Sequence, residues 1–143
     1  MNMVKDILSR KGTNAISVVA GTSVLDALKL MADKNIGSVV VTSPDGKFQG
    51  IVTERDYSRK VVLKGKSSTG VMVEEIMSHD LPIVSPQDSI EHCMQLMTNK
   101  NIRYLPVFSD ALLEGIISMS DVVKATISSQ EETISQLKEY INQ

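Results

Sequence analysis

The chain has 143 residues, of which 42% are hydrophobic, so it can bury a core and is not a disordered polymer. Its formal net charge is −2 and its lysines and arginines are dispersed, which argues against nucleic acid and membrane surfaces as partners. No apolar run approaches the roughly 18 residues of a membrane span, and no signal-peptide core begins the chain. A single cysteine agrees with a reducing compartment, so we expect a cytoplasmic protein.

The first half of the chain predicts a strand, a helix, a hairpin and a second helix. Val24, Leu28 and Met31 recur at the spacing of one buried helical stripe, and residues 43–46 are a strong turn signal. The expected elements are a strand at 16–19, a helix capped by Thr22 or Ser23 and closed by Asn35 and Gly37, a strand buried on both faces at 38–41, a strand at 51–52, and a helix over 54–63.

The second half predicts the same order of elements. Pro106 has no amide to donate, so its strand is expected to be unpaired at that point or to lie at an edge. The expected elements are a strand at 83–84, a helix with Ile90, Cys93, Met94 and Met97 on one face, strands at 105–108 and 115–118, a helix from Met119 or Ser120, and a final helix that Ser129 and Glu132 open as a capping box.

The two halves are copies of one unit. Lys34-Asn35-Ile36 returns as Lys100-Asn101-Ile102, and Gly50-Ile51 returns as Gly115-Ile116. Each copy is too short to close a good core alone, so two copies are expected to stack about a pseudo-twofold axis. The predicted fold class is α+β, with two tandem β-α-β-β-α repeats at 1–66 and 67–128 and a C-terminal helix at 129–143.

No arrangement of residues in the sequence indicates catalysis. His92 and Cys93 are adjacent on a predicted helix and point about 100° apart, so they cannot act as a base and nucleophile pair. His79 stands alone, and no Cys, His or Asp cluster has the spacing of metal ligands. We interpret Cys93 as a buried structural cysteine and expect neither an enzyme nor a metal protein.

A polar pair recurs where a strand meets a helix in each copy. Thr53 precedes Asp56 by three residues, and Ser118 precedes Asp121 by the same interval. Helix capping alone explains such a pair, because the hydroxyl and the carboxylate satisfy free amides in both directions. A helix amino terminus also favours phosphate, and a short carboxylate can hold a ribose diol, so the recurrence favours a nucleotide site as well.

The motif around these pairs resembles the diagnostic pattern of CBS domains. That pattern is glycine, two aliphatic residues, Thr or Ser, two further residues and Asp; it stands here as Gly50-Ile51-Val52-Thr53-Glu54-Arg55-Asp56 and as Gly115-Ile116-Ile117-Ser118-Met119-Ser120-Asp121. The resemblance extends from about Val4 to Val123. It implies a Bateman module in which Thr53 and Asp56, and likewise Ser118 and Asp121, hold ribose or phosphate. By the same resemblance, adenine would lie against Ile16 and Val41 in one site and against Ile83 and Val107 in the other.

Two arginines are candidate phosphate contacts. Arg55 lies in the first turn of its predicted helix, and Arg103 follows the other predicted helix, where the family often carries a basic residue. The pseudo-twofold arrangement would let both converge on one cleft, although both are also explained as solvated surface charges. We therefore expect the cleft of Thr53 and Asp56, which would share Arg103, to bind more tightly than the cleft of Ser118 and Asp121.

The leading hypothesis is a regulatory module that binds an adenosine-containing nucleotide between its repeats and signals to a partner protein. AMP, ADP, ATP and NAD are the candidate ligands, and the arginines favour a phosphorylated ligand over S-adenosylmethionine. The resemblance also implies a homodimer. The rival functions are a ligand-free interaction scaffold with the same fold and, more remotely, an enzyme that slowly hydrolyses nucleotides.

Overall fold

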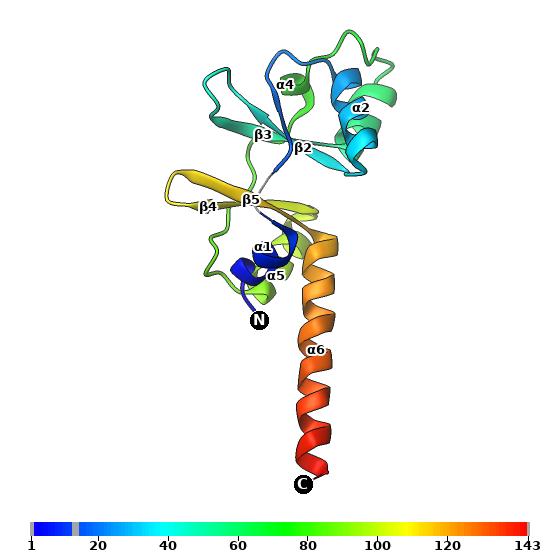
Figure 1. Cartoon of the computed structure of the whole chain (residues 1–143). Coiled ribbons are helices and arrows are strands. Elements are labelled where there is room, and N and C mark those ends of the chain that lie inside the picture. Colours follow the sequence, from blue (N-terminus) through cyan, green and yellow to red (C-terminus); the bar gives the residue numbers. More distant parts are fainter. Residues whose placement is uncertain (1, 13–14, 143) are drawn as a thin grey trace. The chain divides into compact units, whose positions relative to one another are not determined.

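The structure is a computed structural model that describes residues 2–12 and 15–142. It divides into two compact units, one formed by Ala15–Leu81 and the other by Met1–Asn14 together with Pro82–Gln143. Figure 1 shows that each unit has its own sheet and its own helices. These units do not coincide with the expected division at 66/67, since the first residues of the chain join the second repeat and residues 67–81 join the first.

The unit Ala15–Leu81 contains a three-stranded sheet. Its elements are β1 (Ser17–Val19), α2 (Val24–Lys34), β2 (Ser38–Thr42), β3 (Phe48–Thr53), α3 (Glu54–Tyr57), the π-helical turn η1 (Ser58–Val62) and α4 (Val73–Ile76). β1 runs parallel to β2, and β2 pairs with β3 in an antiparallel hairpin. The predicted order of elements from β1 to α3 is confirmed here, but the expected helix at 54–63 continues beyond Tyr57 as a wider turn, and α4 was not predicted.

Local sequence explains the ends of α2. The Ser23 hydroxyl accepts a hydrogen bond from the Asp26 amide at 3.1 Å, and Asn35 closes the helix in the left-handed conformation with φ +54°. The strand β2 is buried on both faces, as predicted, because Val39, Val40 and Val41 are all at most 2% exposed. These caps and buried strands fix the position of the β3–α3 junction.

The second unit contains a two-stranded sheet covered by helices. Its elements are α1 (Val4–Lys11), α5 (Ile90–Lys100), β4 (Tyr104–Ser109), β5 (Leu112–Ser118) and α6 (Met119–Ile141). β4 and β5 are antiparallel neighbours joined by a turn at Asp110. Asp110 has a φ of +54° and adopts the left-handed conformation that Gly46 adopts in the other hairpin. α1, α5, the sheet and the start of α6 share one apolar core.

The expected strand at 83–84 is reduced to a single parallel bridge between Val84 and Val107. In the other unit the Val40 amide donates to the Ile16 carbonyl, and the Ala20 amide donates to the Thr42 carbonyl. The repeat places Pro106 opposite Val40 and Pro86 opposite Ala20, so both donors are missing. Pro106 therefore limits pairing along one side of β4, as the sequence predicted, and the strand is lost rather than only shortened.

Each sequence repeat begins with a helix that packs in the other compact unit. α4 joins the first repeat, where the Val73 amide donates to the Thr22 carbonyl at 2.9 Å. α1 joins the second repeat in the matching way, where the Val4 amide donates to the Asp88 carbonyl at 2.9 Å. This exchange is why the compact units differ from the boundaries expected from the repeat.

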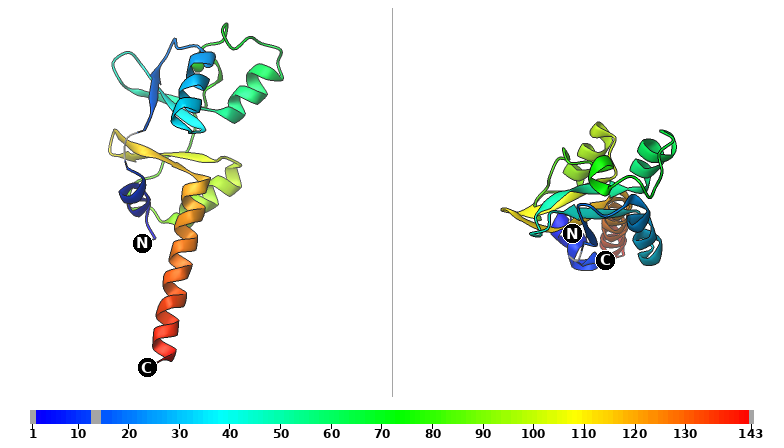
Figure 2. Two further views of the ribbon diagram at one scale, coloured as in Figure 1. Left: turned by 45° about the vertical axis from the view of Figure 1, so that its right-hand side comes forward. Right: turned by 90° about the horizontal axis from the view of Figure 1, so that it is seen from above.

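The expected separate helix at 129–143 is wrong, because α6 is one continuous helix of 23 residues. No glycine or proline interrupts residues 119–141, so nothing ends the helix before Ser129. The Ser129 hydroxyl contacts the Asn2 side chain at 3.0 Å instead of capping a new helix. Figure 2 shows α6 from two further sides. Within the described residues no helix is both long and apolar enough to cross a membrane, and Gln143 lies outside them.

Candidate functional site

The first candidate site lies where β3 meets α3. The Thr53 hydroxyl accepts a hydrogen bond from the Asp56 amide at 3.1 Å. Asp56 Oδ2 in turn accepts from the Thr53 amide at 2.9 Å and from the Thr53 hydroxyl at 3.0 Å. This reciprocal capping box holds the Asp56 carboxylate in one orientation, and Asp56 is only 9% exposed.

Lys60 occupies the other oxygen of Asp56. Its ammonium lies 3.1 Å from Asp56 Oδ1, one helical turn along the chain, and it also donates to the Ile76 carbonyl at 2.9 Å. Ile76 belongs to α4, the exchanged helix. Both oxygens of Asp56 are therefore engaged by residues of the same unit.

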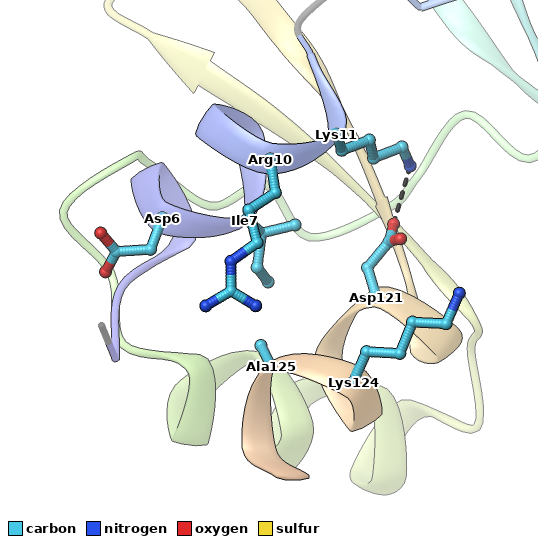
Figure 3. Close-up of a pocket in the computed structure, with 7 residues that line it drawn as sticks. All are labelled: Asp6, Ile7, Arg10, Lys11, Asp121, Lys124 and Ala125. Carbon is cyan, nitrogen blue, oxygen red and sulfur yellow. Dashed lines mark hydrogen bonds and ion pairs between the residues drawn. The ribbon is translucent and has the colours of Figure 1, made fainter. Parts of the chain in front are cut away.

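The second candidate site lies where β5 meets α6. The Ser118 hydroxyl accepts from the Asp121 amide at 3.1 Å, and the Ser118 amide donates to Asp121 Oδ2 at 2.8 Å. Lys11 of α1 donates to the same Oδ2 at 2.7 Å (Figure 3). It also donates to the Ile116 carbonyl at 2.7 Å. Oδ1 of Asp121 carries no bond from any described residue, and the side chain is 20% exposed. This carboxylate keeps one oxygen available.

The surroundings of Asp121 favour its charged form. Burial by itself would raise the pKa of this carboxyl, but the hydrogen bonds from Lys11 and the Ser118 amide outweigh burial and lower the pKa below its ordinary value of 3.8. Asp121 is therefore ionised at neutral pH and remains a hydrogen-bond acceptor.

The four residues expected to wall adenine have different environments. Val41 and Val107 are fully buried within the apolar cores of their units, Ile16 is half-buried beside its core, and Ile83 is 59% exposed. The role of these four residues in binding a base stays a prediction.

The two arginines belong to different units. Arg55 lies in the first turn of α3 and is half-buried. Arg103 is exposed, and its carbonyl accepts a hydrogen bond from the Met119 amide at 2.8 Å, which places the Arg103 backbone beside the start of α6 in its own unit. Their convergence on one ligand stays a prediction.

One cavity adjoins Asp121. It measures about 310 Å³ and lies between α1 and α6, where Figure 3 shows its lining side chains. These are Asp6, Ile7, Arg10, Lys11, Asp121, Lys124 and Ala125. A second cavity, of about 290 Å³, lies in the other unit between α2 and Glu54 and is lined by no lysine or arginine.

Gly50, the first residue of the motif in the first copy, has a packing role. A Cβ at this position would lie 2.7 Å from the Ser78 carbonyl oxygen and 2.9 Å from the Met77 sulfur. Ser78 pairs with Ile51 through hydrogen bonds of 2.9 and 3.0 Å, so the backbone after α4 passes directly over this glycine.

Cys93 is a buried core residue, as predicted. It is 0% exposed, and burial together with the nearby charge of Asp88 raises the pKa of its thiol to about 11. His92 is exposed on the same helix. Over residues 2–12 and 15–142 no group of three His, Cys, Asp or Glu side chains is placed to hold a metal ion.

Sequence reasoning missed the two lysines that contact the motif aspartates. Lys60 follows Asp56 by four residues on a predicted helix, a spacing that brings opposite charges together. This contact could therefore have been predicted from the sequence. Lys11 lies 110 residues before Asp121, and no local pattern connects them. Only the packing of α1 against the second repeat reveals that contact.

Comparison with known proteins gives a consistent result. The sequence matches the CBS domain family over residues 4–62 and 73–128. A curated relative, the CBS domain-containing protein CBSX3 of Arabidopsis thaliana, which is named as mitochondrial, is 36% identical over 146 residues, covering 96% of this chain and 71% of its own length.

Solved structures share the fold. A CBS-domain protein of Burkholderia ambifaria, described as a signal-transduction protein, has a TM-score of 0.84 and 44% identity over 90% of this chain and 96% of its own. The CBS domain pair of MJ0100, solved with 5′-methylthioadenosine and S-adenosylmethionine, has a TM-score of 0.77 and 25% identity over 90% and 98% of the two chains. A hexameric CBS-CP12 protein from bloom-forming cyanobacteria has a TM-score of 0.75 and 30% identity over 86% and 70%.

Proposed function

Since this chain belongs to the CBS-domain family, we propose that it binds an adenosine-containing nucleotide at its motif aspartates, Asp56 and Asp121, and signals the binding to a partner protein. The chain is a pair of CBS domains, a regulatory module. AMP, ADP, ATP and NAD are the proposed ligands. The bound 5′-methylthioadenosine and S-adenosylmethionine of the MJ0100 pair support the adenosine part of this assignment.

The observation that carries the proposal is the state of the Asp121 carboxylate. It is ionised, fixed in orientation by Ser118, and adjoins a cavity, and its Oδ1 has no bond from a described residue. A ribose diol has two hydroxyl donors and suits a fixed carboxylate of this kind. A helix cap alone needs only Oδ2.

Asp56 would bind a ribose less readily than Asp121, which is the reverse of the order expected from the sequence. Its Oδ1 is held by Lys60 and its Oδ2 by Thr53, so a ligand must displace the lysine before the carboxylate can accept a new hydrogen bond. A displaced ammonium would remain close to the ligand, where it favours a phosphorylated compound over a sulfonium such as S-adenosylmethionine. Arg55 and Arg103 are proposed as further phosphate contacts.

Signalling requires that the ligand change an equilibrium between two arrangements of the protein. Lys11 offers one route, because it links the Asp121 carboxylate to α1, which begins the chain. A ligand that binds the Asp121 carboxylate would compete with the Lys11–Asp121 ion pair. Loss of this ion pair would weaken the packing of α1 against its unit. A partner protein that recognises α1 would then distinguish the bound from the free state.

The ligand-free scaffold remains the alternative function. Both capping boxes are complete without a ligand, so the fold itself does not require one. The regulatory character of the family and the unused Oδ1 of Asp121 favour the sensor. We assign no catalytic role, and the cytoplasmic location expected from the sequence is part of the same proposal.

A homodimer formed through α6 is part of the proposal. Ile127, Ile134, Leu137 and Ile141 follow the 7-3-4 spacing of a heptad seam, and each is at least 49% exposed. Isoleucine at the first heptad position with leucine at the fourth favours two parallel helices, so a second copy of α6 is the partner that fits this stripe. The hexameric relative is the alternative assembly.

Thermal unfolding of the ligand-free protein tests the function. AMP, ADP, ATP, NAD, S-adenosylmethionine and 5′-methylthioadenosine are added in turn. A ligand at a hundredfold its dissociation constant adds about 2.7 kcal/mol of stability, a shift of several degrees for a chain of this size. A shift that Asp121→Asn abolishes supports the sensor. If the unfolding temperature with every compound equals that of the ligand-free protein, the ligand-free scaffold is favoured.

A further inference from the structure

We infer that a second copy of α6 lies parallel to the first and in register with it, and that Gln130 sets this alignment by meeting its own counterpart. The inference rests on the homodimer included in the proposed function. It adds the register of the two helices and the residue that determines it.

One polar residue interrupts the apolar stripe of α6. The stripe has a heptad spacing whose first positions are Ile127, Ile134 and Ile141 and whose fourth positions are Val123, Gln130 and Leu137. We call these six residues the seam. Its five apolar members are each at least 43% exposed, and Gln130 is exposed as well. The Gln130 amide makes no hydrogen bond with the described part of the chain, so it is available to a partner.

The seam faces away from the unit that contains α6. Val122 and Ala125 are buried in the apolar core of that unit, and they occupy the third and sixth heptad positions, on the side of the helix opposite the seam. Over residues 130–141 every side chain of α6 is exposed. A second helix can therefore reach the seam without displacing the core contacts of α6.

The Gln130 amide distinguishes parallel from antiparallel pairing. Between parallel helices a fourth position faces a fourth position, so in register Gln130 meets Gln130 of the second copy, and each amide offers the other a donor and an acceptor. Between antiparallel helices a fourth position faces a first position, so Gln130 would be buried against an isoleucine such as Ile134. Each copy would then bury an amide without a hydrogen-bond partner, which is unfavourable.

The same amide distinguishes between parallel registers. A shift by one heptad would place Gln130 against Leu137 on one side of the dimer and against Val123 on the other. Both amides would again lack a partner. The parallel pair in register is thus the alignment in which Gln130 of each copy is satisfied.

The residues beside the seam are compatible with this alignment. The fifth heptad positions are Lys124, Glu131 and Lys138, and the seventh positions are Thr126, Thr133 and Tyr140. In a parallel pair each seventh position faces the following fifth position of the second copy, so Thr126 faces Glu131 and Thr133 faces Lys138. No like charges are brought together.

Parallel alignment places the motif aspartates of the second repeat at the same end of the dimer. Val123, the first residue of the seam, follows Asp121 by two residues along α6. The Asp121 sites of both copies would therefore adjoin the beginning of the seam, whereas an antiparallel pair would hold them at opposite ends.

Disulfide cross-linking of the full chain tests the inference. Val123→Cys and Ile141→Cys place one thiol at each end of the seam, and Cys93 does not interfere because it is fully buried. Parallel copies in register bring each thiol against its own counterpart, so each variant should form a disulfide dimer alone. Antiparallel copies would hold identical thiols roughly 27 Å apart, and only a mixture of the two variants would cross-link. Mass spectrometry of the linked peptides identifies the joined positions.

Gln130→Leu, introduced into both thiol variants, tests the role of the amide. We expect disulfides between positions 123 and 141 to rise about tenfold in this mixture, because an apolar residue at position 130 is satisfied in either orientation. Gln136→Leu is the matched control, since it makes the same substitution at an exposed position of α6 outside the seam and should add no such disulfide.

The outcomes separate this inference from the proposed function. A mixture that forms mainly disulfides between positions 123 and 141 while Gln130 is present would overturn the parallel alignment and leave the homodimer standing. An unchanged pattern of disulfides in Gln130→Leu would overturn the role of Gln130. Variants that remain monomeric in sedimentation and form no disulfide would overturn the inference and the homodimer together. Nucleotide binding is measured separately by titration with ADP, so its failure is distinguishable from each of these results.

Discussion

The ammonium of Lys11 lies 2.7 Å from Asp121 Oδ2, although 110 residues separate the two in sequence. The contact joins the helix that opens the chain to the motif aspartate of the second repeat. Lys60 makes the corresponding contact with Asp56, but from one turn away on the same segment. The two repeats thus neutralise equivalent carboxylates with lysines of unrelated origin, and only the Lys11 contact involves a distant element.

Replacement of Lys11 by Met should reduce the dependence of stability on acid. The folded-state pKa of Asp121 lies below its ordinary value, so its ionised form stabilises the protein above about pH 4, and this contribution is lost as pH falls through the folded pKa. Because the Lys11 side chain is 40% exposed, solvent screening limits the effect to about 1 kcal/mol or less.

Urea unfolding at pH 7 and pH 3 measures this difference. Lys11→Met should be less stable than the parent at pH 7, and the difference in the free energy of unfolding should be smaller at pH 3. Lys5→Met, on the same helix and outside the cavity, is the control, and its free energy of unfolding should stay close to that of the parent at both pH values. An equal loss for Lys11→Met at both pH values would show that packing, and not the ion pair, causes the effect.

Replacement of Gly50 by Ala should destabilise the unit Ala15–Leu81. The added methyl would lie 2.7 Å from the Ser78 carbonyl oxygen, which is fixed by its pairing with Ile51, so the backbone must move. We expect a loss of about 1–3 kcal/mol in the free energy of unfolding. Gly70→Ala is the matched control, because its nearest neighbour would be 3.9 Å away. Equal stability of the two variants would contradict this account.

Cys93 should be unreactive in the folded protein. Its thiol is buried, and a pKa of about 11 keeps it protonated at neutral pH. Labelling with iodoacetamide at pH 7.5 should proceed only through unfolding, so its rate should rise steeply with added denaturant. Rapid labelling of the native protein would show that the α5 face is open and that the thiol is available for redox chemistry.

Features encoded locally were predictable from the sequence. The helix ends at Ser23 and Asn35, the hairpin at residues 43–46 and the capping boxes of Asp56 and Asp121 each depend on side chains within a few residues. Pro106 predicted a break in strand pairing because proline has no backbone N–H to donate.

Features that depend on packing were not predictable. The exchange of α1 and α4 between the compact units leaves no local signal, and the Lys11–Asp121 contact follows from that exchange. Ser129 and Glu132 have the spacing of a capping box, yet they lie inside α6 because the preceding residues also favour a helix. A capping pattern marks a helix start only where the helix before it ends.

The exposed stripe of α6 should mediate dimerisation. Ile134→Glu combined with Leu137→Glu places charges in the seam and should convert a dimer to a monomer in sedimentation velocity. Ser135→Glu combined with Gln136→Glu adds the same charge beside the stripe and should leave the dimer intact. A double seam variant that sediments like the parent would contradict the α6 dimer.

Calorimetric titration of ADP into the parent protein, Asp121→Asn, Asp56→Asn and the double variant tests the central claim most directly. The account predicts saturable binding by the parent protein, at least a tenfold loss of affinity in Asp121→Asn, and no measurable binding by the double variant, with all four proteins folded by circular dichroism. Binding to the folded double variant with the affinity of the parent would contradict the assignment of the motif aspartates as the nucleotide site.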